Sequence, residues 1–395
     1  MRALIAATVV MLGCGSALPA LPSQGGAPWR EVATDHFTLW TDSSSERARE
    51  LVTQLEHQYV IFSTALAGGK AHGRVLVIAP RIENELRAFL PPGNDAYIAM
   101  SAALQFTVIA DAYPDDRHQL GLAYVVAQAI SHGVVYRQPA WLEDGIGSFL
   151  ETARVRDGQV QLGTPPAERV RFVRRHDLMP TTDLFACDDR ACNIAWRKAT
   201  AWVLFEFLVG KHVDELDRYL IRLAELPPDS FAQAWREVFP ALPPGPQLDK
   251  ALHDFITYEA LPTIAFRDPE LHVQPAERML SEPEIAALRA VARLQFLHDR
   301  AGALEDAATA LAGDPTNLIA TLVKHAADSH AVTVDTARAV AAAHDSDWRA
   351  WWLIERIERD AKASDADDAH ARMCAAAAAD PSAAIDPQLC AAPAR

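Results

Sequence analysis

Apolar positions in the first part of the chain follow two different periods, which predicts alternating strands and helices. Phe37 and Leu39 alternate with polar neighbours as in a strand, whereas residues 46–66 have the spacing of an amphipathic helix. Residues 74–78 form a short apolar run, which indicates a buried strand. The same reasoning predicts a helix at 82–89 and two strands at 97–100 and 104–110 that are close enough to pair as a hairpin.

The spacing then becomes helical. Asp115 or Asp116 caps a long helix, Pro139 ends it, and a second helix follows at 140–153. Further helices are predicted at 166–175, 193–209, 214–226, 229–238 and 247–258. Prolines are frequent just beyond residue 260, and this composition predicts a linker at 263–282.

A 33-residue period follows the linker. Asp314, Asp347 and Asp380 are each 33 residues apart, and each is predicted to close a helix of small residues. The period is close to that of tetratricopeptide repeats, so we expect an all-α, repeat-like region at 283–395 with a groove for a peptide or partner protein. An Ala-rich helical bundle with accidental spacing is the alternative, because Trp348 stands where proline follows the other two aspartates.

Composition and charge are those of a folded, acidic protein with more than one domain. The chain has 395 residues, of which 50% are hydrophobic and 23% charged, and this is enough for two or three folded domains. The formal net charge of −15 argues against a nucleic-acid partner, since phosphate binding needs a basic face. No internal run reaches the ~18 apolar residues of a membrane-spanning helix.

The N-terminus has the pattern of an export signal. Arg2 precedes an apolar stretch at 3–12 that ends at Gly13 and Cys14. Residues 11–14 resemble a bacterial lipobox, which implies that Cys14 is acylated, that 1–28 is signal and tether, and that membrane contact is through this lipid alone. We therefore expect an exported protein on the periplasmic face of the envelope, anchored to the outer membrane. Ordinary secretion, with cleavage a few residues later, is the alternative.

The remaining cysteines fall into two local pairs. Cys187 and Cys192 bracket a short loop, while Cys374 and Cys390 bracket the Ala-rich C-terminal stretch. In an oxidising compartment, two disulfides are the expected outcome. A metal site at the first pair would need another ligand, for which His176 is the only nearby candidate.

Residues 128–132 and 141–145 lie on the two consecutive helices predicted after residue 115. Residues four apart share one helix face, so Gln128 and His132 point the same way. Two histidines with this spacing can bind one zinc ion, a glutamate after the first acts as general base, and a carboxylate elsewhere completes the ligands. In this chain Ala129 follows Gln128, and Asp144 lies on the second helix.

The runs QAISH and WLEDG together resemble the active-site frame of a gluzincin, as found in peptidase MA-like domains of unknown function. The order of other segments is similar as well, from WREV at residue 29 to ATAWVL at 199–204. This resemblance implies an α+β fold over 29–262. It would have a small mixed sheet, two active-site helices and a helical second half, as in thermolysin.

The same resemblance places Gln128 at the first ligand position and Ala129 at the position of the general base. An amide is a poor zinc ligand, and a methyl group cannot accept the proton whose transfer is worth about 10²–10⁴-fold in rate. We therefore expect a vestigial frame with no catalytic residue and no cofactor, and, if any metal ligands, only His132 and Asp144. Such a protein would bind a peptide or a protein partner through the cleft and the helical repeats.

A working enzyme is the alternative function. It would be a zinc metallopeptidase with Gln128, His132 and Asp144 as ligands and Glu143 as the base.

Overall fold

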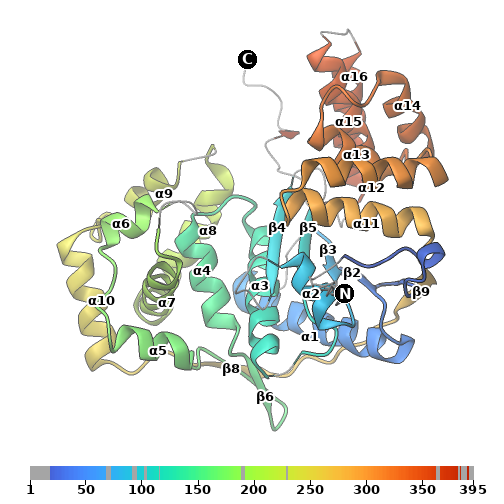
Figure 1. Cartoon of the computed structure of the whole chain (residues 1–395). Coiled ribbons are helices and arrows are strands. Elements are labelled where there is room, and N and C mark those ends of the chain that lie inside the picture. The colour runs from blue at the N-terminus through green and yellow to red at the C-terminus, as the bar shows by residue number, and fades with distance from the viewer. Residues whose placement is uncertain are drawn as a thin grey trace, which may run out of the picture.

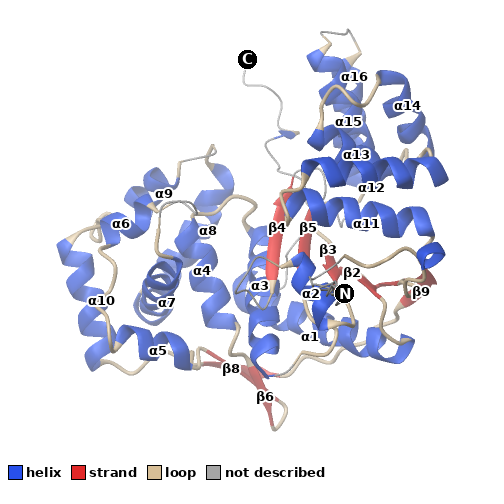
Figure 2. Ribbon diagram, viewed as in Figure 1, coloured by secondary structure: helices blue, strands red, loops and turns tan. Residues whose placement is uncertain are grey.

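The computed structural model describes residues 18–67, 73–90, 96–101, 105–114, 116–187, 192–227, 230–361, 365–380, 383 and 389–390. Cys14 and Asp115 lie outside these residues. The chain folds as a mixed α/β protein in which a six-stranded sheet separates two groups of helices, confirming a small mixed sheet followed by helices (Figures 1 and 2).

The sheet is mixed in direction. Its strands lie in the order β4 (Tyr97–Ser101), β5 (Gln105–Ile109), β3 (Val75–Ile78), β2 (Phe37–Thr41), β1 (Arg30–Ala33) and β9 (Ala276–Met279). Strands β2, β3 and β5 are parallel, whereas β4 and β1 run antiparallel to their neighbours. The predicted hairpin is confirmed as β4–β5, with β4 at the edge of the sheet.

Alternation along the strands directs apolar side chains to both faces of the sheet. Leu39, Val77 and Val108 point to one face and pack with α1 (Ser45–Ala67) and α3 (Asp116–Val134). The next residue of each strand points to the other face and packs with α2 (Glu83–Phe89) and α11 (Glu282–Gln295); these residues are Trp40, Ile78 and Ile109. Helices therefore cover both faces of the sheet.

The helical half follows α3. It consists of α4 (Ala140–Leu150), α5 (Ala167–Val173), α6 (Thr181–Ala186), α7 (Ile194–Lys211), α8 (Val213–Glu225), α9 (Phe231–Val238) and α10 (Pro246–Tyr258). An aromatic cluster of Trp141, Tyr219 and Trp235 joins α4, α8 and α9, with ring centroids 5.6–6.0 Å apart. The helices predicted in this half of the chain are present.

One hairpin in this half was not predicted. Strands β6 (Arg154–Arg156) and β7 (Gln159–Leu162) are joined by Asp157 and Gly158, both with positive φ. An Asp-Gly pair is a strong hairpin signal because both turn positions favour the left-handed region. The strands are short, and β6 is exposed, so the alternation of apolar residues that would reveal them is weak.

The segment expected as a linker contributes one strand to the six-stranded sheet and one to a second, three-stranded sheet. Strand β8 (Ile264–Arg267) pairs with β7, which gives this second sheet the order β6–β7–β8, and β9 pairs with β1. The β1–β9 pairing is accompanied by ion pairs from Arg30 to Glu277 at 2.6 Å and from Arg278 to Glu31 at 2.9 Å. This segment therefore ties the sheet to the C-terminal helices.

The C-terminal helices are α11, α12 (Arg300–Gly313), α13 (Leu318–Ala327), α14 (Val334–Ala343), α15 (Trp348–Asp360) and α16 (Ala366–Ala379). Asp314 and Asp380 end α12 and α16, as expected. Asp347 does not end a helix, and that prediction was wrong. Its carboxylate accepts from the backbone N–H of Arg349 and so caps the start of α15.

Residues 18–28, expected within a flexible tether, are packed on α11. Leu21 is buried in the core shared by the sheet and α11, next to the short 3₁₀ helix Pro22–Gln24. Ser23 donates to Glu282, and Arg289 donates to the carbonyl of Pro19 at 3.3 Å. An apolar anchor and two polar contacts hold this part of the chain in place.

Both predicted disulfides are present. Cys187 is bonded to Cys192 and Cys374 to Cys390, with Cα atoms 5.9 and 5.5 Å apart. Disulfides persist in oxidising compartments, so the pair indicates a location outside the cytoplasm. Within the described ranges, no helix has the length and apolar character needed to span a bilayer.

Candidate binding cleft

A cavity of about 1160 Å³ opens between the sheet edge and the helical half. Its walls come from strand β4 and from helices α3, α4, α5 and α7. They include Tyr97, Ile98, Tyr124, Gln128, Glu143, Asp144, Glu151, Arg169, Arg197 and Lys198. The two helices that carry the predicted frame therefore line one side of this cleft.

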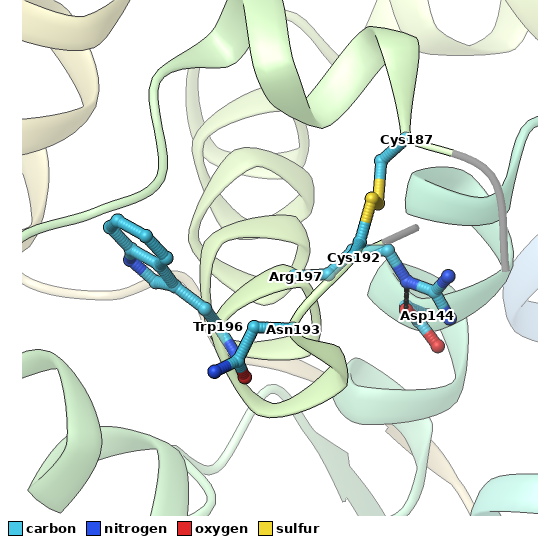
Figure 3. The surroundings of a disulfide bond; sticks show 6 residues. All are labelled: Asp144, Cys187, Cys192, Asn193, Trp196 and Arg197. Carbon is cyan, nitrogen blue, oxygen red and sulfur yellow. Dashed lines mark hydrogen bonds and ion pairs between the residues drawn. A yellow bond between two sulfur atoms is a disulfide. The ribbon is translucent and has the colours of Figure 1, made fainter. Parts of the chain in front are cut away.

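Asp144 lies at the centre of a buried hydrogen-bond chain. Its side chain is almost fully buried, Nε of Arg197 donates to its Oδ2 at 2.7 Å, and the Tyr124 hydroxyl donates to its Oδ1. Figure 3 shows Arg197 reaching from α7 toward Asp144 on α4. Burial raises the pKa of the Asp144 carboxyl, while the charge of Arg197 offsets part of this effect.

Gln128 extends the same chain on α3. Its Nε2 donates to the hydroxyl oxygen of Tyr124 at 3.2 Å, so the order is Gln128, Tyr124, Asp144 and Arg197. Burial, and then the negative charge of Asp144, raises the pKa of Tyr124, which keeps its hydroxyl protonated as a donor. Tyr124 precedes Gln128 by one helical turn, and that spacing was the only sequence signal for its role.

His132 lies apart from this chain. It is buried, its Nδ1 is 3.1 Å from the carbonyl oxygen of Tyr136, and its Nε2 is 3.6 Å from Oε1 of Glu143. Ala129 is buried in the hydrophobic core. The structure thus brings Gln128 and Asp144 together through Tyr124, and it pairs His132 with Glu143 instead.

These donors do not fit a tetrahedral zinc site. Both carboxylate oxygens of Asp144 accept hydrogen bonds, and the amide nitrogen of Gln128 points to Tyr124. Across the part of the chain that the structure describes, no three His, Cys, Asp or Glu side chains gather as a metal-binding group. The metal site considered for Cys187 and Cys192 is also absent, because these two residues form a disulfide.

Two glycines of α4 allow the helices around Asp144 to approach closely. A Cβ atom at Gly145 would lie 2.8 Å from Cβ of Phe205 on α7. A Cβ atom at Gly147 would lie 2.8 Å from the ring of Tyr124 on α3. Real Cβ atoms do not approach this closely, so any larger residue would displace the helices that bring Tyr124 and Arg197 to Asp144.

Two cationic side chains contact the aromatic ring of Tyr124. Nζ of Lys198 lies 4.3 Å from the ring centroid, and Cζ of Arg169 lies 5.4 Å from it. Arg169 donates to Glu151, and burial raises the pKa of Glu151 to about 7. Sequence reasoning missed these residues. For Lys198 a signal was available, because Arg197 and Lys198 are adjacent in a largely apolar helix.

The first turn of α7 is fixed from two directions. The Asn193 side chain caps the helix by accepting from the N–H of Trp196 at 3.2 Å. The Cys187–Cys192 disulfide joins the end of α6 to the residue before this cap (Figure 3). These restraints position the turn that carries Arg197 and Lys198.

Comparison with protein-family models and with curated proteins finds no match for this chain. The likeness to peptidase MA-like domains therefore rests on the order of the motifs.

Proposed function

We propose that this protein is a non-catalytic, exported binding protein whose cleft holds a peptide or an extended segment of a protein. The main support is the state of Asp144. At the position where a gluzincin has its third zinc ligand, this carboxylate is bound by Arg197 and Tyr124. A group held in this way stabilises the walls of the cleft and is not available to a metal.

The cleft offers two features that suit an extended peptide. Strand β4 is at the edge of the sheet and contributes Tyr97 and Ile98 to the wall. Edge strands carry backbone groups that can pair with an added strand, and alternate side chains then enter neighbouring pockets. The cavity of about 1160 Å³ is large enough for several residues of such a strand.

In this proposal the N-terminal segment attaches the protein to the outer membrane through acylated Cys14, facing the periplasm. The two disulfides support export but do not distinguish a lipid anchor from simple secretion. Metabolic labelling with a fatty acid distinguishes them, since label should be lost in Cys14→Ser. The C-terminal helices, stacked on the sheet, would be a second surface for a partner protein.

One observation favours the enzymatic alternative. Nδ1 of His132 faces a carbonyl oxygen, a contact that commonly orients the ring of a zinc-bound histidine, and Nε2 is near Glu143. A zinc peptidase using this pair would need further ligands, and Asp144 would have to leave Arg197.

Zinc content and peptide binding together test the proposal. Purified, untagged protein should contain far less than one zinc per chain, should not cleave denatured casein, and should bind fluorescent peptides from a mixed library. Near-stoichiometric zinc that is lost in His132→Ala, together with proteolysis, would overturn the proposal in favour of the enzyme.

A further inference from the structure

The charge of the cleft is unlike that of the whole chain. The protein has a formal net charge of −15, yet the cavity is lined by five cationic side chains and four carboxylates. Two of these cations are tightly paired, Arg197 with Asp144 and Arg169 with Glu151. The cavity therefore carries no excess of negative charge in an otherwise acidic protein.

Three of the five cations lie outside these two pairs: Arg154 and Arg171, which are exposed, and Lys198, which is partly buried. Among the described residues, no carboxylate lies within 4.0 Å of the Lys198 ammonium group, which contacts the Tyr124 ring instead.

Burial lowers the pKa of Lys198. The negative charges of Asp144 and Glu151 oppose this effect, and the positive charges of Arg169 and Arg197 add to it. A partly buried ammonium that no carboxylate contacts directly is costly, and an anion bound to it would stabilise its charged form.

The surroundings of Lys198 favour the same kind of ligand. Arg169 contacts the same aromatic ring, so two positive charges are held close together and repel each other. The first turn of α7 contains no acidic residue, and Ile194 and Ala195 of that turn line the cavity. The positive end of the helix dipole therefore adds to the attraction for an anion.

We infer that the cleft recognises its ligand through a carboxylate group, which pairs with Nζ of Lys198 beside Arg169. This inference rests on the proposed function, because it names the group by which a bound peptide is held. The carboxylate has two sources in a peptide, the C-terminus and an Asp or Glu side chain. In both cases the peptide gains a charge-assisted hydrogen bond inside the cleft.

Two matched peptide series separate these sources. One series compares a free C-terminus with the same peptide amidated, and the other compares internal Glu with Gln at each position. Binding is measured by fluorescence polarisation at constant ionic strength. We expect one of these neutral replacements to weaken binding about tenfold or more, which is the range for a hydrogen bond to a charged group.

The protein variants assign the effect to one residue. Lys198→Met removes the charge and keeps the length of the side chain, so it should abolish the preference for the carboxylate, whereas Lys198→Arg should keep much of it. Lys211→Met is the matched control on the same helix, since Lys211 pairs with Glu259 on the surface, and it should bind like the unaltered protein. Thermal unfolding checks that all three variants are folded.

The outcomes are distinguishable. If peptides bind but the neutral and carboxylate forms bind equally well, or if Lys198→Met keeps the preference, the inference is wrong and the proposed function stands. If no peptide of either series binds, the proposed function and the inference both fall.

Discussion

Arg197 on α7 and Asp144 on α4 form a buried ion pair across 2.7 Å, although 53 residues separate them in sequence. The pair joins the helix that carries the WLEDG run to the main helix of the helical half. It also fixes one wall of the cleft.

Removing one partner of this pair should be strongly destabilising. In Arg197→Met the carboxylate of Asp144 remains buried without its cation, and such a loss costs roughly 3–5 kcal/mol. Urea unfolding measures the change. The double variant Arg197→Met/Asp144→Asn should recover much of it, because no unpaired charge is left.

The surface pair Arg222–Glu237, at 2.6 Å, provides the matched control. Exposed ion pairs contribute about 0–1 kcal/mol, so Arg222→Met should change the free energy of unfolding little. A similar loss for both arginine variants would contradict the structural role of the buried pair.

Glu206 on α7 should make stability depend on pH. Its side chain is fully buried, Nε1 of Trp202 donates to Oε1 at 2.9 Å, and Oε2 has no hydrogen-bond partner among the described residues. Burial raises its pKa from 4.5 to about 8. The folded state therefore holds a proton that the unfolded state releases above pH 4.5, and stability falls as pH rises from there to about 8.

Glu206→Gln removes this titration. The variant should show a flatter stability profile between pH 5 and 9 and should gain on the unaltered protein at the alkaline end. Denaturant unfolding at several pH values gives both curves. Parallel curves would mean that Glu206 does not hold this proton.

Restoring a histidine at the first ligand position should not restore zinc binding. In Gln128→His the third-ligand position remains occupied by the Asp144–Arg197 pair. Adding Arg197→Met should raise zinc affinity, since it releases the carboxylate, and calorimetric titration with zinc measures both variants. Tight binding by Gln128→His alone would show that Asp144 exchanges Arg197 for a metal.

The two disulfides should differ in their contribution to stability. Cys187 and Cys192 close a loop with a sequence separation of 5, whereas Cys374 and Cys390 have a separation of 16. In the chain-entropy model these loops contribute about 2 and about 3 kcal/mol. Paired Cys→Ala variants should lose stability in that order under urea unfolding, and the reverse order would contradict this account.

Local patterns predicted most of the secondary structure, because strand and helix periods arise within single segments. Strands β2 to β5, helices α3 to α5 and helices α7 to α10 follow that rule, whereas α6 was not predicted. Contacts between distant segments were not predictable in this way. Nothing near Asp144 identifies Arg197 as its partner, and nothing near residues 276–279 indicates that they complete a sheet begun at residue 30.

In the cleft, too, local features were predictable and contacts between distant segments were not. The sequence places Gln128, His132 and Asp144 on two neighbouring helices, and the structure agrees. The partner of Asp144, however, comes from a third helix, α7, which lies about 50 residues further along the chain. The pairing of Asp144 with Arg197 of that helix, and not with His132, could not be read from the two runs themselves.

The pairing of β9 with β1 determines when the six-stranded sheet can be completed during synthesis of the chain. The outer neighbour of β1 follows only after some 240 further residues, so a chain made from its N-terminus cannot complete the sheet until about 280 of its 395 residues are present. A fragment ending at residue 262 would leave strand β1 as an unpaired edge and one sheet face without α11. Such a fragment should aggregate when expressed alone, because an apolar sheet face and an unpaired strand edge are exposed.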